Sequence, residues 1–498
     1  MVSGVTMCSR FLGLVRDSLF FATFGASLFG EAFLLAFTLP NLFRRMLGEG
    51  TLSSAFVPVF SSSWHESGMS RAWNLLNQII SRMLLYLGGG VLIVCLLSWL
   101  VSYFFHTAPL KWVYAFKLNG IIFCYLVMIC TSAILVGAQN VRGRFFEGAI
   151  SPVVLNMCMI LCLLISPIFS NNDREFYAFM LGVSVVVAGL IQLWFPWRAL
   201  RKKESWKWKF DLSCSEDINA VKSLFWVGAL GATVAQLNLL ISRFLAYSLD
   251  ETGGLSYLYM AARLVELPLG VFAIAISTVL FPRLAQASSQ KDERKYQKSF
   301  FIGMRLIGAI TLPASLGLFV LADPIIRLLF EWNAFGPEQT QKAVEVLKIA
   351  TWTIPFYAFS TFLVKAFHSE KDMKRPLHAA VVSLIVNFLL SMFLMEQYGV
   401  LGLAWANLIS AFCQVLFLCS RKNGLQLADW LKPTRISILS PFLGCLGIYL
   451  FLMNAFPFFS SLNGKLSDFF AIGILVPSSM LIYVLLLKFQ GFSWTVES

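Results

Sequence analysis

The chain has 498 residues, of which 58% are hydrophobic and only 13% are charged, and its formal net charge is +13. A soluble chain would carry about a quarter charged residues. The composition therefore excludes a soluble globular protein and indicates an integral membrane protein, with no polar stretch long enough for a soluble catalytic domain.

Apolar runs long enough to cross a bilayer as a helix recur along the whole chain. They predict an all-α membrane protein with about fourteen transmembrane helices, near residues 2–24, 28–60, 75–105, 113–138, 149–169, 176–198, 219–247, 255–282, 300–322, 343–366, 376–395, 398–420, 434–456 and 467–489. The first run lacks a basic leader and a small-residue cleavage site, so we interpret it as a retained helix rather than a signal peptide.

Lysine and arginine gather in alternate loops, near residues 142–144, 198–209, 283–298, 371–375 and 421–435, whereas the loops at 26–30, 170–175 and 250–254 carry few. Basic loops lie on the cytoplasmic side of a membrane. The pattern therefore predicts a multi-pass membrane protein with both termini in the cytoplasm.

An internal repeat indicates two lobes. The sequence SRFL occurs at 9–12 and again at 242–245, and the pairs Leu39-Pro40 and Leu267-Pro268 follow in the same order. We predict a six-helix lobe at 1–200, a basic linker at 201–218, a second six-helix lobe in pseudo-symmetric repeat at 219–421, and two additional helices at 433–489. Transporters built from such repeats bind substrate between the halves.

Aromatic and basic residues alternate in the linker, which reads RKKESWKWKFDLSCSED at 201–217. Such a loop is typical of a segment that lies on lipid headgroups, anchored here by Trp206 and Trp208. The alternative is a dedicated site for nucleic acid or for a lipid headgroup. We favour the first interpretation and expect no nucleic-acid partner.

Charged side chains inside the predicted membrane helices are the main functional signal, because each costs about 2.5–3.5 kcal/mol at the centre of a membrane helix. They are Arg10, Arg16, Glu31, Arg44, Arg263 and Glu266. Arginine outnumbers the acidic residues, and its guanidinium suits phosphate. The pattern predicts a cavity for a phosphate-bearing anion. The alternatives are snorkelling of the arginines to the interface and an intrahelical pair between Arg263 and Glu266, which share a helix face.

Helix-breaking residues lie beside these charges. Pro40 separates Glu31 from Arg44, and Pro268 and Gly270 follow Glu266. We predict that these three residues act as hinges, because proline removes a helical hydrogen bond and glycine relaxes the backbone.

Signatures of catalysis are missing from the sequence. The four histidines have no metal-ligand spacing, and neither a phosphate-binding GxxxxGK[ST] loop nor a GxSxG nucleophile motif occurs. We therefore expect a transporter rather than an enzyme, without a metal site or an organic cofactor.

Several segments closely resemble the MurJ (MviN) family of lipid II flippases. The resemblance lies in SRFLGLVRD at 9–17, EAFLLAFTLPNLFRRMLGEGTLSSAFVPVFSS at 31–62, ARLVELPLGVFAIAISTVLFPRLAQAS at 262–288 and FHSEKDMKRP at 367–376. It implies a fourteen-helix protein of the bacterial cytoplasmic (inner) membrane, in a superfamily that includes the MATE drug exporters. It also implies translocation of lipid II, the undecaprenyl-diphosphate-linked peptidoglycan precursor, from the inner to the outer leaflet by alternating access.

The family's diphosphate-binding arginines correspond here to Arg10, Arg16, Arg44 and Arg263. Its acidic gating position corresponds to Glu31, and Glu266 is a further candidate for gating or charge pairing. The last two helices correspond to a groove for the lipid tail.

The chain departs from the family's pattern at a proposed sodium site. Ser242 and Ser391 stand where many relatives carry aspartate, although Asn387 matches a third ligand, and Ala262 replaces an aspartate beside Arg263. Sodium or chloride stays a possible coupling ion rather than an expected one. We further expect a monomer that binds lipid II, membrane lipids and cell-wall synthesis proteins. The open alternatives are a MATE-like multidrug exporter and a flippase for another polyprenyl-linked oligosaccharide.

Overall fold

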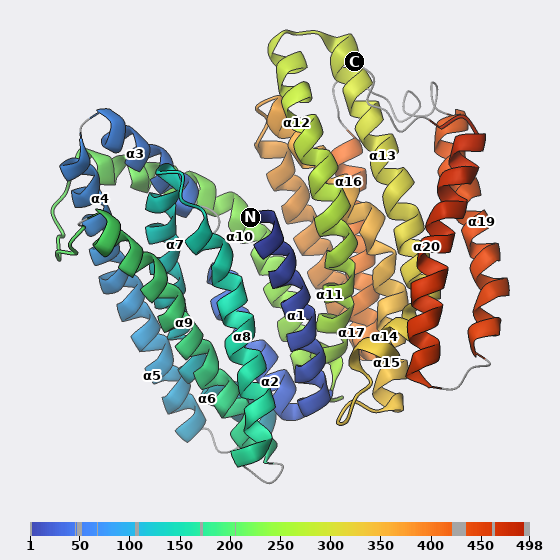
Figure 1. The fold of residues 1–498 in the computed structure, drawn as a ribbon, viewed down its shortest axis with the longest axis horizontal. Helices are drawn as coiled ribbons and strands as arrows, with labels where there is room; N and C mark the ends of the chain where they lie inside the picture. Colours follow the sequence, from blue (N-terminus) through green and yellow to red (C-terminus); the bar gives the residue numbers. More distant parts are fainter. Residues whose placement is uncertain are drawn as a thin grey trace. The chain divides into compact units, whose positions relative to one another are not determined.

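The computed structural model describes residues 2–44, 46, 52–66, 68–104, 109–169, 173–204, 206–420, 435–460 and 464–492. These residues form helices joined by short connections, with no β-strand among them. They divide into two compact units (Figure 1), one formed by Met1–Leu240 with Asn333–Phe335 and the other by Ile241–Trp332 with Gly336–Ser498.

The first unit is a bundle in which α1 packs on α8, α8 on α9, α9 on α7, α2 on α6 and α5 on α6. Its elements are α1 (Val2–Phe24), α2 (Leu28–Phe43), α3 (Leu52–Glu66), α4 (Met69–Arg82), the π-helical turn η2 (Met83–Leu87), α5 (Gly88–Phe104), α6 (Leu110–Ile122), α7 (Tyr125–Val141), α8 (Phe146–Phe169), α9 (Arg174–Glu204) and most of α10 (Glu216–Ser248).

The second unit contains the C-terminal pair, in which α19 packs on α20 and α13, and α20 on α14. Its elements are α11 (Gly254–Pro268), the π-helical turn η3 (Leu269–Ala273), α12 (Ile274–Ser289), α13 (Glu293–Val320), α14 (Ala322–Phe330), α15 (Pro337–Thr351), α16 (Thr353–Ser369), α17 (Lys374–Cys419), α19 (Arg435–Ser460) and α20 (Lys465–Phe489).

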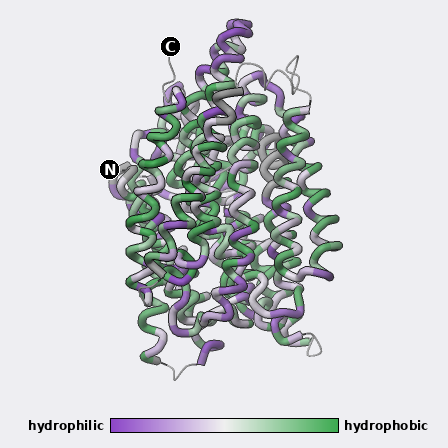
Figure 2. The backbone as a smooth tube through the Cα atoms, turned by 90° about the vertical axis from the view of Figure 1, so that its right-hand side faces the viewer, coloured by the Kyte–Doolittle hydropathy of each residue, from purple (hydrophilic) through white to green (hydrophobic). Residues whose placement is uncertain are grey.

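The helices have the length and apolarity of membrane spans. Ten helical runs of the described residues are long and apolar enough to cross a membrane, and hydrophobic residues dominate most of the helical length (Figure 2). The other predicted segments correspond to α1, which carries Arg10, Arg16 and Asp17, to α2 with 16 residues, to α10, and to the second half of α17. The prediction of a multi-pass all-α membrane protein is confirmed.

Two predicted segments, 376–395 and 398–420, form the single 46-residue element α17, which turns at Gly399. A straight helix of that length would measure about 69 Å, more than twice the apolar core of a bilayer. Gly399 has φ 54° and ψ −131°, values that glycine adopts without strain. A Cβ atom at Gly402 would lie 2.3 Å from the Leu394 carbonyl oxygen, so the chain folds back on itself here.

The predicted segment 28–60 corresponds to two elements, α2 and α3, and residues 47–51 between them lie outside the described residues. The basic loop at 421–434 lies outside the described residues, as do the first two residues of the predicted pair 433–489.

The predicted linker docks on α4 within the first unit. Trp206 is only 2% exposed, and its indole N–H donates to Asn77 Oδ1 at 3.1 Å. Arg82 Nη2 donates to the Ser213 carbonyl oxygen at 2.8 Å. The prediction of a headgroup anchor is therefore wrong for Trp206, which is part of the protein core, whereas Trp208 is 39% exposed.

The linker ends in an ion pair that joins α10 to α4. Arg71 donates to both carboxylate oxygens of Asp217, at 2.8 and 2.9 Å, and the Ser63 hydroxyl donates to Oδ2 at 3.1 Å. The hydrogen bond from Arg71 is the main reason why the pKa of Asp217 lies below its ordinary value, and desolvation opposes it.

The turn in α17 predicts that Gly402→Ala destabilises the protein by about 1–3 kcal/mol, because the new methyl group would overlap a backbone carbonyl. Thermal unfolding in detergent would measure the change. Gly317→Ala is the control, since a Cβ atom there meets nothing within 4 Å, and it should be neutral or stabilising by about 0.4–1 kcal/mol. Equal Tm values for the two variants would contradict a close approach between Gly402 and the Leu394 carbonyl oxygen.

The Arg71–Asp217 pair predicts an acid-sensitive contribution to stability. Because the folded pKa of Asp217 is depressed, its stabilising effect is present above the unfolded value of about 3.9 and is lost as pH falls through the folded value. The difference in Tm between wild type and Asp217→Asn should be constant at neutral pH and shrink in acid below about pH 4. Glu216→Gln is the control, because Glu216 is almost fully exposed, and its difference from wild type should be small throughout.

Candidate functional site in the transmembrane helices

Arg16 lies in the middle of α1 and is held inside the first unit. Only 8% of the residue is exposed, and the neighbouring Asp17 is 2% exposed. In the next two turns of the same helix, Phe20, Phe21 and Phe24 are buried as well. Packing of α1 against α8 therefore removes the guanidinium from solvent.

Acceptors from two helices surround the Arg16 guanidinium. Its Nε and Nη2 donate to Asp17 Oδ1 at 3.0 and 2.5 Å, and its Nη1 donates to Asn156 Oδ1 at 3.1 Å. Asn156 belongs to α8 and donates its own amide N–H to the Ser9 carbonyl oxygen at 3.0 Å. The amide is thus fixed with its oxygen towards Arg16. We call Arg16, Asp17 and Asn156 the α1–α8 cluster.

The α1–α8 cluster is the arrangement that a buried charge requires. Removing one partner from a buried, hydrogen-bonded ion pair costs about 3–5 kcal/mol, because the other charge remains without compensation. In the conformation described here the guanidinium is neutralised by the protein itself. An anionic ligand of Arg16 would compete with Asp17 for the guanidinium.

The other two predicted arginines of the first unit have different surroundings. Arg10 lies two turns earlier in α1 and is exposed. Arg44 follows the end of α2 in a π-helical turn, is half-buried, and donates from Nε and Nη2 to Asn41 Oδ1 at 3.1 and 3.0 Å. Arg10 is therefore accessible, whereas the donors of Arg44 already have a neutral acceptor.

Glu31 is buried in the first turn of α2, with 4% of the residue exposed. Ser27 is the N-cap of this helix and accepts a hydrogen bond from the Gly30 N–H at 3.5 Å. The positive end of the helix dipole stabilises a carboxylate in this position. Pro40 lies inside the same helix, which continues to Phe43.

In the second unit, Arg263 and Glu266 form an ion pair along α11, with Nη1 and Oε2 separated by 3.6 Å. The pair that their spacing predicts is therefore present. The side chains are 29% and 48% exposed, so water weakens the attraction. Helix geometry changes directly afterwards, because Pro268 ends α11 and Gly270 lies in the π-helical turn η3. Such π-turns often occur at functional sites.

The residues at the family's proposed sodium site bond to one another instead. The Asn387 amide N–H donates to Ser242 Oγ at 2.9 Å, and Ser242 and Ser391 donate to the Asn407 and Asn387 side-chain oxygens, both at 3.4 Å. No carboxylate belongs to this buried group, which we call the Ser242 cluster. The side chains of these four residues would offer a cation only neutral oxygen ligands.

Two parts of these sites were not predicted from the sequence. Neither Asn156 nor Asp17 is among the predicted site residues, although Asn156 is a polar residue inside an apolar run. Asn407 was overlooked for the same reason as Asn156. A buried amide in a membrane helix needs a partner, and that requirement is the signal that could have identified both.

Comparison with known proteins identifies the relationship of the whole chain. The family model described as "Lipid II flippase MurJ" matches residues 20–465. The probable lipid II flippase MurJ of Bdellovibrio bacteriovorus is 30% identical over 450 residues, which cover 88% of this chain and 85% of the relative. That of Vibrio cholerae is 31% identical over 458 residues, covering 88% and 84%.

Solved structures agree on the fold. A structure of the lipid II flippase MurJ in an inward closed conformation has a TM-score of 0.78 at 24% identity and covers 98% of both chains. An inward-facing MATE transporter has a TM-score of 0.66 at 13% identity and covers 85% of this chain and 96% of its own. At such identities the structures support the fold alone, and the family assignment rests on the sequence matches. The chain belongs to the MurJ family of lipid II flippases.

Proposed function

We propose that this protein moves lipid II from the inner to the outer leaflet of the cytoplasmic membrane by alternating access, with the diphosphate bound by Arg10, Arg16, Arg44 and Arg263. The observation that carries the proposal is the buried guanidinium of Arg16 in a membrane-spanning helix, bonded to Asp17 and Asn156. The family relationship supplies the substrate class.

Exchange of acceptors is the central step. Arg16 donates to Asp17, Arg44 to Asn41, and Arg263 pairs with Glu266. A diphosphate offers several charged oxygens to the same donors, and arginine binds phosphate with two parallel hydrogen bonds. The incoming diphosphate replaces these acceptors, and their return to the arginines favours its release. The exposed Arg10 makes the first contact with the headgroup.

Changes in helix geometry accompany this exchange. Pro40 lies between Glu31 and Arg44 in α2, and Pro268 and Gly270 lie where α11 passes into η3. These residues act as hinges, because backbone hydrogen bonding is already irregular there. Glu31 and Glu266 act as gating or pairing carboxylates, which hold arginines that are not bound to substrate.

The lipid tail stays in the bilayer or along α19 and α20, and both termini are cytoplasmic because the basic loops lie on that side. The protein acts as a monomeric transporter rather than an enzyme, uses no organic cofactor, and cooperates with membrane lipids and cell-wall synthesis proteins. A MATE-like drug exporter is disfavoured, because cationic drugs would call for an excess of acidic rather than basic residues in the membrane helices.

Replacement of Arg16 tests the substrate role. Arg16→Ala should slow the flipping of fluorescent lipid II in proteoliposomes by about tenfold or more, because a charge-assisted bond to phosphate is lost. Arg16→Lys should retain part of the rate, since it keeps the charge without the planar donors. Arg294→Ala removes an exposed charge and should flip like wild type. Wild-type rates in Arg16→Ala would refute the assignment.

The Ser242 cluster predicts flipping that does not depend on sodium, because its neutral groups bond to one another. The rate with lipid II should be the same in sodium and in N-methylglucamine buffers when an ionophore holds the membrane potential constant. As a control, the flipping rate is measured at fixed sodium while the membrane potential is varied, which detects a step that moves charge across the membrane. A several-fold slower rate without sodium would contradict the prediction.

A further inference from the structure

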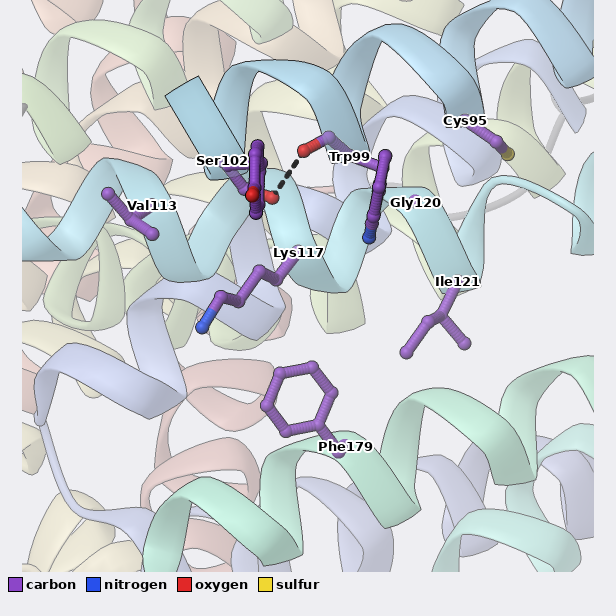
Figure 3. A pocket seen from close by; sticks show the side chains of 9 residues that line it. Cys95, Trp99, Ser102, Val113, Lys117, Gly120, Ile121 and Phe179 are labelled. Carbon is purple, nitrogen blue, oxygen red and sulfur yellow. Dashed lines mark hydrogen bonds between the residues drawn. The ribbon is translucent and has the colours of Figure 1, made fainter. Parts of the chain in front are cut away.

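A pocket with a cavity volume of about 500 Å³ opens in the first unit beside α5, α6 and α9. Figure 3 shows its lining side chains, with Trp99 extending from α5 towards α6, and Lys117 and Phe179 extending into the space between α6 and α9. The pocket is lined by Cys95, Trp99, Ser102, Tyr103, Val113, Lys117, Gly120, Ile121 and Phe179. None of these residues belongs to the sites described above.

Lys117 is the one charged residue among those nine. It is exposed, and its ammonium lies 5.2 Å from the centre of the Tyr114 ring. The Tyr114 hydroxyl donates to Glu175 Oε2 at 2.7 Å, so this carboxylate already has a partner. A lysine that points into an otherwise uncharged pocket of a membrane helix bundle favours an anionic ligand.

Two aromatic rings from α5 also line the pocket. Trp99 and Tyr103 stack with their centroids 5.7 Å apart and their planes 12° apart, and they are 61% and 56% exposed. The Trp99 indole carries an N–H that can donate to a phosphate. Tryptophan and tyrosine are enriched at the level of the lipid headgroups, which indicates that the pocket lies at that level.

The position of the pocket along its helices agrees with this level. Lys117 lies about 10 Å from the start of α6 at 1.5 Å per residue, and Trp99 and Tyr103 belong to the last two turns of α5. Exposed apolar side chains continue along α5 and α9, among them Leu96, Leu100, Val183 and Val187. Acyl chains can pack on these surfaces below a headgroup bound at Lys117.

We propose that this pocket binds an anionic glycerophospholipid of the bilayer, with the headgroup phosphate on Lys117 and Trp99 and the acyl chains along α5 and α9. A single ammonium matches one phosphate monoanion, whereas a diphosphate would call for several donors. The volume suits a small headgroup rather than the sugar and peptide of a cell-wall precursor. Lipid binding at this pocket does not depend on the membrane topology proposed above.

Native mass spectrometry of the full chain in detergent tests the proposal with phosphatidylglycerol as the probe. Lys117→Gln should weaken binding of the first phosphatidylglycerol about fivefold, the effect of one lysine at a lipid surface, and Lys117→Arg should preserve it. Arg174→Gln is the matched control, since Arg174 is an exposed cation at the start of α9, and it should bind like wild type. Equal affinities for Lys117→Gln and wild type, or equal losses in Lys117→Gln and Arg174→Gln, would overturn the proposal.

Photocrosslinking then locates the lipid and identifies its class. Phosphatidylglycerol with a photoreactive headgroup should label peptides that contain residues 99–121 or 179. Unlabelled phosphatidylglycerol should compete, whereas phosphatidylcholine and inorganic phosphate should not. Labelling confined to the basic loops, equal competition by phosphatidylcholine, or competition by undecaprenyl diphosphate in preference to phosphatidylglycerol would each refute this assignment.

Discussion

A guanidinium cannot be left without acceptors inside a membrane protein, and this constraint explains the arrangement of the charged residues. Arg16 is almost completely buried in α1, and Asp17 and Asn156 accept its hydrogen bonds. Without such acceptors the charge would face an environment of low dielectric at a cost of several kcal/mol. The cluster also joins α1 to α8, because Asn156 of α8 accepts from Arg16 and donates to the Ser9 carbonyl oxygen of α1.

The same constraint links structure to transport. An arginine whose acceptors come from the protein is stable without substrate, and in the proposed exchange the bonds to phosphate oxygens have to offset the cost of leaving the displaced carboxylate without its partner. A neutral amide beside Arg44 and a partly exposed carboxylate beside Arg263 are weaker acceptors than the buried Asp17. The four arginines therefore differ in how readily they are released, which provides an order in which substrate contacts can form. The hydrogen-bonded Ser242 cluster offers no comparable charge to exchange.

Most of the helices could be predicted from the sequence, because a long apolar segment is a strong signal for a membrane helix. Contacts between residues that are distant in the sequence leave no such signal. The sequence at 28–60 did not separate α2 from α3, because both elements are apolar. The sequence predicted two segments here, 376–395 and 398–420, but the turn lies at Gly399, inside the second of them. Burial of Trp206 against Asn77 could not be foreseen, because tryptophan beside lysine is equally typical of a headgroup anchor. Arg16 could be identified because a charge inside a membrane helix is energetically costly. Its partner Asn156 could not, because it lies 140 residues away in the sequence.

Exchange of Asp17 for the lipid diphosphate can be measured directly through the affinity of detergent-solubilised protein for lipid II. Asp17→Asn retains the shape of the side chain and removes the charge that competes for Arg16. Exchange predicts a lower Kd for folded Asp17→Asn than for wild type, and no such gain when Arg16→Ala is combined with it. An unchanged or higher Kd in folded Asp17→Asn would contradict exchange and would mean that Asp17 supports substrate binding instead of competing with it.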